Sequence, residues 1–134
     1  MIGDICQVKN DPPHSYGDCL RACVASLLDM ETLSVPHFVH DGCAPEMTFQ
    51  RLREWLVGRG LVPMMSGYPA SETPDELLHF MGETNPCVHY ILLSANHAVV
   101  CYGDKIVHDP AWVKSPLTPP TDMWITLVLT RDCR

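Results

Sequence analysis

The spacing of apolar positions changes character along the chain. Apolar residues that follow Asp18 recur every three or four positions, which predicts a largely buried helix over residues 19–30 with Asp18 as its N-cap. The same spacing predicts a second helix over 45–57, ended by glycines, and a third over 74–82. The first half of the chain is therefore expected to be mainly helical.

The second half consists of short runs rich in β-branched and aromatic residues. These runs predict strands over 88–93, 98–102, 105–107 and 124–129, and a further short strand is expected over 61–66. Gly103-Asp104 forms a tight turn between two of the runs and predicts an antiparallel hairpin. Helices followed by antiparallel strands indicate an α+β fold, with N-terminal helices packed on a C-terminal antiparallel β-sheet. At 134 residues the chain fits one domain, residues 1–134.

Composition narrows the function classes. The chain has 9 basic and 16 acidic residues and a formal charge of −7, so nucleic acid is not expected as a partner. No apolar run approaches the roughly 20 residues of a membrane span, and no signal peptide is visible, so we expect no membrane association and a cytoplasmic location. If the chain is phage-encoded, this is the host cytoplasm. The oligomeric state is left open.

Seven cysteines are present, an odd number in a chain without a secretory signal, which disfavours a disulfide scaffold. They are Cys6, Cys19, Cys23, Cys43, Cys87, Cys101 and Cys133. A buried free cysteine behaves as a small apolar residue, and we expect this role for Cys87 and Cys101, which lie in or beside apolar runs.

Cys19 is the exception, because it lies at the start of the first predicted helix. Unpaired backbone N–H groups and the positive end of the helix dipole stabilise a thiolate there, and the thiolate is the reactive form of cysteine. Gly17, two residues earlier, would let a substrate approach the backbone closely. Cys19 is therefore a candidate nucleophile.

A candidate base and orienting carboxylate lie in the predicted hairpin. His97 begins the strand His-Ala-Val-Val-Cys-Tyr, and Asp109 ends the next strand in Ile-Val-His-Asp-Pro. Counting six residues back and six forward from Gly103 gives positions 97 and 109, which predicts that the two side chains meet at one end of the sheet. Asp109 would hold one ring nitrogen of His97 while the other faces Cys19, as nucleophilic catalysis requires. These residues predict attack on an amide or related acyl carbon through a thioester, with a peptide or protein as the expected substrate and no cofactor.

Three segments carry a resemblance to a known family. They are Gly17-Asp18-Cys19-Leu20-Arg21-Ala22-Cys23, Asn96-His97-Ala98-Val99-Val100 and His108-Asp109-Pro110. In this order they resemble the papain-like cysteine peptidases that trim double-glycine leader peptides in bacteriocin exporters, and also small uncharacterised proteins of phages and bacteria. The resemblance implies a papain-like domain and a cysteine peptidase or amidase with a Cys-His-Asp triad.

The resemblance also implies a glutamine that stabilises the oxyanion, six residues before the nucleophile. Pro13 stands at that position here, and Gln7 lies twelve residues before Cys19. A looped-out insert over residues 9–14 would bring Gln7 into the oxyanion hole. Otherwise the hole would use the backbone N–H of Cys19 together with His14 or Asn10.

Several alternatives remain open at this point. Transfer of the acyl group to an amine would make the protein a transglutaminase-like acyltransferase, and a papain-like scaffold without activity would be a binding module. His108 is an alternative third member beside Asp109, as in cell-wall peptidases of the Cys-His-His kind. A structural zinc site is a further alternative, because His37, His40 and Cys43 are spaced like ligands.

Overall fold

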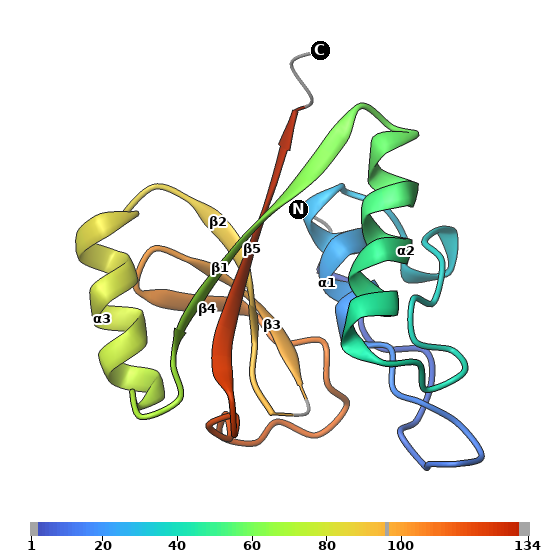
Figure 1. The fold of residues 1–134 in the computed structure, drawn as a ribbon, viewed down its shortest axis with the longest axis horizontal. Coiled ribbons are helices and arrows are strands. Elements are labelled where there is room, and N and C mark those ends of the chain that lie inside the picture. The colour runs from blue at the N-terminus through green and yellow to red at the C-terminus, as the bar shows by residue number, and fades with distance from the viewer. Residues whose placement is uncertain (1–2, 96, 132–134) are drawn as a thin grey trace.

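The structure is a computed structural model that describes residues 3–95 and 97–131; Asn96 and Cys133 lie outside the described residues (Figure 1). Its elements follow in the order α1 (Cys19–Leu27), the short 3-10 helix η1 (Thr32–Ser34), α2 (Pro45–Val57), β1 (Leu61–Pro69), α3 (Pro74–Thr84), β2 (His89–Leu93), β3 (Ala98–Tyr102), β4 (Lys105–His108) and β5 (Met123–Arg131).

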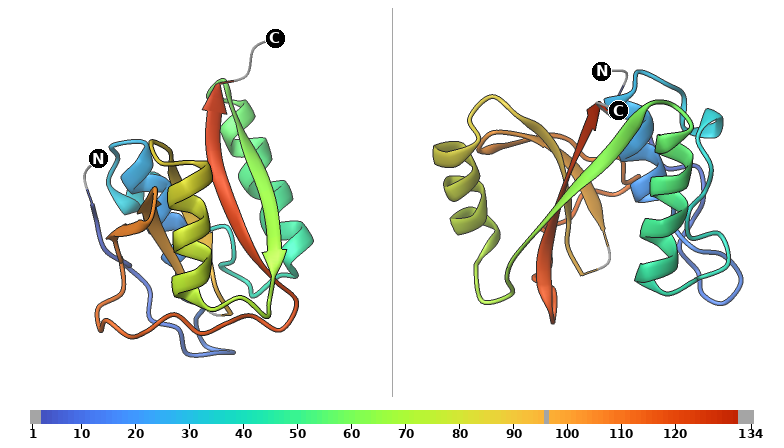
Figure 2. Two further views of the ribbon diagram at one scale, coloured as in Figure 1. Left: turned by 90° about the vertical axis from the view of Figure 1, so that its left-hand side faces the viewer. Right: turned by 45° about the horizontal axis from the view of Figure 1, so that its top comes forward.

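A five-stranded antiparallel sheet lies at the centre, in the order β1-β5-β2-β3-β4. α1 and α2 lie on one side of the sheet and α3 lies on the other, as the views in Figures 1 and 2 agree. The α+β class predicted from the sequence is therefore confirmed for the described residues. In these residues, no helix has the length and apolar character needed to cross a membrane.

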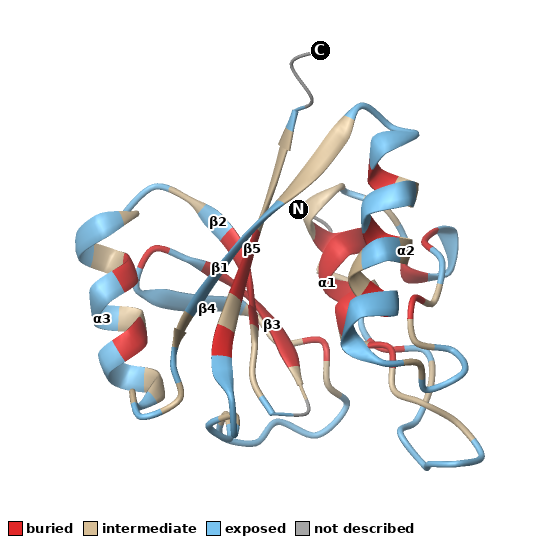
Figure 3. Ribbon diagram, in the orientation of Figure 1, coloured by how far each residue is buried: buried red, intermediate tan, exposed pale blue. Residues whose placement is uncertain are grey.

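Each face of the sheet carries its own apolar cluster, because successive strand residues point to opposite sides. Ile91 and Val100 face α1 and α2, whereas their neighbours Tyr90, Leu92 and Cys101 pack on the side of α3. Figure 3 shows this burial in the central strands and along the inner sides of the helices. Closely packed layers on both faces hold the strand ends, and the side chains there, in fixed positions.

The helices largely match their predicted bounds. α2 spans residues 45–57 as predicted, and α3 begins with a capping box in which Thr73 and Glu76 each accept a hydrogen bond from the other's backbone N–H. The first helix was predicted to reach Met30 but ends at Leu27. Asp29 has a positive φ of 55°, a left-handed conformation that a continuing α-helix does not allow.

Some strands are longer than the runs of β-forming residues in the sequence predicted. β1 extends to Pro69 because all nine of its residues pair with β5. The predicted hairpin is present, with Tyr102 paired to Lys105 across the turn and Gly103 at a positive φ of 58°. Cys101 is buried as expected, but Cys87 is exposed, so its expected burial was wrong. Cys87 precedes β2 and lies outside the alternation that buries the strand residues.

Candidate active site

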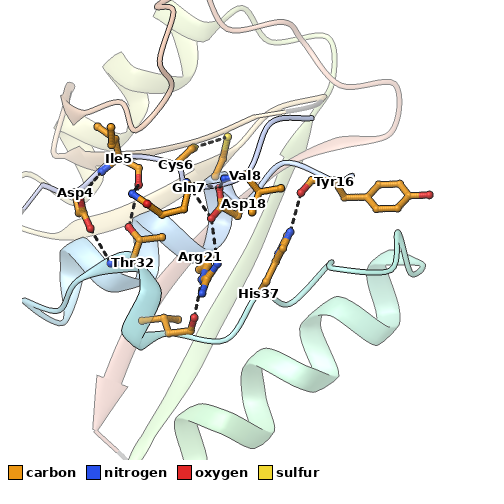
Figure 4. Close-up of polar contacts among 12 residues, drawn as sticks. Asp4, Ile5, Cys6, Gln7, Val8, Tyr16, Asp18, Arg21, Thr32 and His37 are labelled. Atoms are coloured by element: carbon orange, nitrogen blue, oxygen red, sulfur yellow. Dashed lines mark hydrogen bonds and ion pairs between the residues drawn. The ribbon is translucent and has the colours of Figure 1, made fainter. Parts of the chain in front are cut away.

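Cys19 is the first residue of α1, so its backbone N–H precedes the first intrahelical hydrogen bond, which Ala22 donates to the Asp18 carbonyl. Asp18 occupies the predicted N-cap position, but its side chain makes no capping hydrogen bond to the helix. The fully buried carboxylate instead accepts hydrogen bonds from the N–H groups of Gln7 and Val8, at 2.9 and 3.1 Å. Figure 4 shows Asp18 between this N-terminal segment and Arg21, whose guanidinium lies 3.4 Å from the carboxylate. Asp18 therefore holds the N-terminal segment around Gln7 and Val8 beside the start of α1.

His97 joins the nucleophile candidate to a carboxylate. Its Nδ1 lies 3.0 Å from the Sγ of Cys19, and its Nε2 lies 2.6 Å from Oδ1 of Asp109. The His97 and Asp109 side chains are only 15% and 18% exposed. The structure thus brings together the three residues singled out from the sequence, from the start of α1, the residue before β3 and the residue after β4.

The pairing of β3 with β4 differs from the symmetric pairing about Gly103 that was used to predict the position of Asp109. The turn is centred between Gly103 and Asp104, and a bulge follows, after which Val100 pairs with His108 instead of Val107. A one-residue shift reverses the face that each later residue presents. Counting from Gly103 correctly identified Asp109 as the neighbour of His97. The bulge, and not a regular register, is what turns the Asp109 side chain toward His97.

His108 points to a different part of the molecule from Asp109. Its Nε2 lies 2.6 Å from the carbonyl oxygen of Asp4, in the N-terminal segment. The ring also packs beside Gly3. This geometry does not support the alternative in which His108 completes a Cys-His-His site.

Electrostatics favour a charged pair at Cys19 and His97. A hydrogen bond from the Cys6 thiol, followed by the hydrogen bond and positive charge of His97, lowers the pKa of Cys19 to about 5 against the opposing effect of burial. The hydrogen bond and charge of Cys19, with further contributions from Asp109, raise the pKa of His97 to about 9. Between about pH 5 and pH 9 the favoured state is a thiolate and an imidazolium. Both ring N–H groups then donate, one to sulfur and one to the carboxylate.

Cys6 is a site residue that sequence reasoning missed. Its Sγ lies 3.4 Å from the Sγ of Cys19, and the residue is only 6% exposed. Its backbone N–H donates to the Pro110 carbonyl at 2.9 Å, and its own carbonyl accepts from Nε1 of Trp112 at 2.6 Å. Cys6 is therefore held between the nucleophile candidate and the loop that follows Asp109. No sequence motif marks this contact, because Cys6 lies thirteen positions before Cys19 and an irregular segment joins them.

A cavity of about 370 Å³ opens beside Cys19 and His97. Its wall is mainly apolar and comes from α1, α2, β5 and the segment before β3; it includes Leu20, Val39, Pro45, Phe49, Leu93, Met123 and Ile125, with Asn10, Cys43, Thr48 and Ser94 as polar members. A cavity of this kind can hold the acyl part of a substrate against the thiolate.

Gln7, the expected oxyanion residue, does not line this cavity. Its side-chain amide donates to the Ile5 carbonyl at 3.2 Å, and the residue is exposed. The looped-out insert therefore does not bring the Gln7 side chain to Cys19, because the backbone of Gln7 is fixed by Asp18 instead. Asn10, which was the alternative, does line the cavity.

Asn10 is oriented by a backbone hydrogen bond. Its Oδ1 accepts from the N–H of Gly17 at 3.1 Å, so the Nδ2 group remains as the donor end of the amide. A Cβ at position 17 would lie 3.1 Å from Cβ of Asn10, closer than most real contacts. Gly17 thus allows the close approach of Asn10 that the sequence alone did not indicate.

The residues proposed for zinc do not come together. Nε2 of His37 lies 2.7 Å from the Tyr16 carbonyl (Figure 4), and the thiol of Cys43 contacts Thr48 and Arg51. Within residues 3–95 and 97–131 no group of three or more His, Cys, Asp or Glu side chains is arranged to hold a metal ion. The geometry therefore gives no support to the His37–His40–Cys43 alternative.

Comparison of the chain with protein-family models, curated proteins and solved structures found no match. The function must therefore be inferred from the site itself.

Proposed function

We propose that this protein is a papain-like cysteine hydrolase, a peptidase or amidase, in which Cys19 is the nucleophile, His97 the acid and base, and Asp109 the orienting residue. The observation that carries the proposal is the continuous contact from the Cys19 sulfur through both ring nitrogens of His97 to the Asp109 carboxylate. The placement of these groups supports a papain-like arrangement: a nucleophile opens a helix on one face of an antiparallel sheet, and the base directly precedes a strand of that sheet.

The reaction follows from the charged pair. The Cys19 thiolate attacks the acyl carbon, and the carbonyl π electrons move to oxygen. As the tetrahedral species collapses, the His97 imidazolium gives its Nδ1 proton to the leaving amine, which departs and leaves a thioester on Cys19. The neutral imidazole then takes a proton from water, which attacks the thioester and releases the acid. Asp109 keeps Nε2 protonated and stabilises the positive ring throughout.

The oxyanion would be held by the backbone N–H of Cys19 and the side-chain amide of Asn10. Both groups belong to the part of the structure that borders the cavity, and the Asn10 amide already has its donor end free of the Gly17 contact. Donors fixed before the reaction stabilise developing charge without reorganisation.

A chromogenic ester tests the hydrolase directly. The protein is incubated with 4-nitrophenyl acetate, release of 4-nitrophenol is followed, and the acyl group is located by mass spectrometry. We expect acetylation of Cys19 with repeated turnover, loss of both in Cys19→Ala, and retention of both in Cys87→Ala, whose residue is exposed and does not line the cavity. Acetylation of Cys19 without turnover would contradict hydrolysis and is the result expected of a non-catalytic module.

Asn10→Ala is expected to lower the turnover of this ester by about a hundredfold, the range for loss of one oxyanion donor. Alkylation of Cys19 by iodoacetamide should change little, since that reaction forms no oxyanion. Gln7→Ala is the matched control, because its amide bonds to Ile5 and lies away from the cavity. If Gln7→Ala proves the damaging variant and Asn10→Ala the harmless one, the assignment of the oxyanion donor is wrong.

A further inference from the structure

We propose that Cys6 and Cys19 form a redox-active dithiol, in which a peroxide oxidises Cys19 and Cys6 then closes a reversible disulfide with it. The structure places the two sulfur atoms 3.4 Å apart, with both cysteines as free thiols. A disulfide requires about 2.05 Å, so the sulfur atoms need to approach by about 1.3 Å.

The position of Cys6 suits a resolving thiol. It is buried, so small oxidants reach Cys19 first, through the cavity that Cys19 and His97 line. The Cys6 backbone is fixed on both sides, by the Pro110 carbonyl and by the Trp112 indole. These two hydrogen bonds hold the backbone of Cys6 in place and thereby keep its sulfur beside that of Cys19.

Cys19 has the chemical character of a peroxide-sensitive thiol. The thiolate form is favoured, and a thiolate that is accessible and next to a cation is the species that peroxides oxidise. Its sulfur attacks one oxygen of hydrogen peroxide and the O–O bond breaks. The departing hydroxide takes the Nδ1 proton of the His97 imidazolium to become water, and Cys19 becomes a sulfenic acid.

Cys6 then completes the oxidation. Its sulfur attacks the sulfur of the Cys19 sulfenic acid, the S–S bond forms, and the S–O bond breaks. The hydroxyl group leaves with the Cys6 proton as a second water. In total, two thiols lose two electrons and two protons, and one peroxide is reduced to two waters.

The reduced state keeps Cys6 protonated until this step. The hydrogen bond to Cys19, followed by burial, raises the pKa of Cys6. Conversion of Cys19 to a sulfenic acid removes the thiolate to which the Cys6 thiol donates. The main restraint on Cys6 is thereby released only after Cys19 has been oxidised.

Two consequences follow. A disulfide would protect Cys19 from further oxidation to the sulfinic acid, which is not reversed by thiols. It would also remove the nucleophile, so oxidation would switch hydrolysis off reversibly; this second consequence rests on the proposed function, whereas the disulfide itself does not.

Peptide mapping under non-reducing conditions tests the dithiol. Trypsin cuts after Lys9 and Arg21, which places Cys6 on peptide 1–9 and Cys19 on peptide 10–21. After brief treatment of the whole protein with hydrogen peroxide, we expect these two peptides to be joined and the iodoacetamide labelling of Cys19 to be lost. Dithiothreitol should restore the labelling in full.

The variants make the outcome decisive. In Cys6→Ser, peroxide should convert Cys19 to the sulfinic acid, and dithiothreitol should not restore its labelling. Cys87→Ser, which removes an exposed thiol, should behave as wild type. Joining of peptide 10–21 to a peptide that carries Cys23 or Cys43, or irreversible oxidation of Cys19 at equal rates in wild type and Cys6→Ser, would overturn the proposal. Since mapping does not measure hydrolysis, a disulfide found in a protein with no esterase turnover would refute the proposed function alone.

Discussion

Replacement of His97 with alanine is expected to raise the pH at which Cys19 becomes reactive from about 5 toward the ordinary thiol value of about 8.5. His97 contributes a hydrogen bond at 3.0 Å and a positive charge to the thiolate, and both disappear in the variant. The hydrogen bond from Cys6 remains, so part of the depression should persist. Because the folded-state pKa of this acid is lowered, thiolate is present above about pH 5 in wild type and is lost as the pH falls through that value.

The expected loss of alkylation rate at pH 5.5 is about tenfold. A shift of about three pKa units from the wild-type value of about 5 lowers the thiolate fraction at pH 5.5 by roughly two hundredfold, and the greater nucleophilicity of a more basic thiolate offsets part of that loss. The measurement is a pH series of brief iodoacetamide pulses followed by peptide mapping. The exposed Cys87 serves as an internal reference for the reagent.

His108→Ala is the matched control, since it removes the neighbouring histidine of the hairpin, whose ring faces the Asp4 carbonyl. Its Cys19 profile should superimpose on that of wild type. A profile that is the same in His97→Ala as in wild type would show that His97 does not activate Cys19. A wild-type midpoint near that of an ordinary thiol would contradict the charged pair itself.

Asp109→Asn should preserve the fold and lower ester turnover by about a hundredfold. The amide is nearly the same size, and its oxygen can still accept the Ala111 N–H, which lies 3.0 Å from Oδ1 of Asp109. It cannot stabilise an imidazolium as a carboxylate does, and it can hold the wrong ring tautomer. In a serine-protease triad the corresponding change costs about four orders of magnitude in turnover. A cysteine thiolate is the better nucleophile and depends less on its base, so the loss should be smaller.

Thermal unfolding and ester turnover are measured on the same preparation of Asp109→Asn. Asp104→Asn, at the exposed turn of the same hairpin, is the control and should match wild type in both measurements. A lowered thermal midpoint with unchanged turnover would mean that Asp109 only supports the loop that follows it, through the hydrogen bond from the Ala111 N–H. The site would then consist of Cys19 and His97 alone.

The parts of this protein that the sequence alone determined are those fixed by local chemistry. The bounds of α2 follow from an apolar stripe with a proline at one end and glycines at the other, and α3 begins where Thr73 and Glu76 can cap it. The hairpin follows from Gly103, which accepts the positive φ of the turn. The positions of Cys19 and His97 could be read from the same local signals, because each lies at the start of an element that the pattern predicts.

The tertiary structure decided which groups surround these residues. The pairing of Cys6 with Cys19, the binding of Gln7 and Val8 by Asp18, and the presence of Asn10 in the cavity all depend on how residues 3–17 fold back over α1. That segment has few periodic apolar residues, so no pattern fixes its path. Its position is set by long-range hydrogen bonds, such as that from the Trp112 indole to the Cys6 carbonyl, which join residues about a hundred positions apart.

The bulge in β4 is a second feature that the tertiary structure decided and the sequence did not. Alternation along a strand predicts which residues share a face, but a single extra residue in a bulge reverses that prediction. The residues Ile106-Val107-His108 contain no sequence signal for the bulge that the structure shows there. The register is settled by the fit of the strand against β3 and of His108 against the N-terminal segment. The sequence therefore identified the nucleophile, base and carboxylate of the candidate site. The contacts around them depend on side chains that meet only after the whole chain has packed.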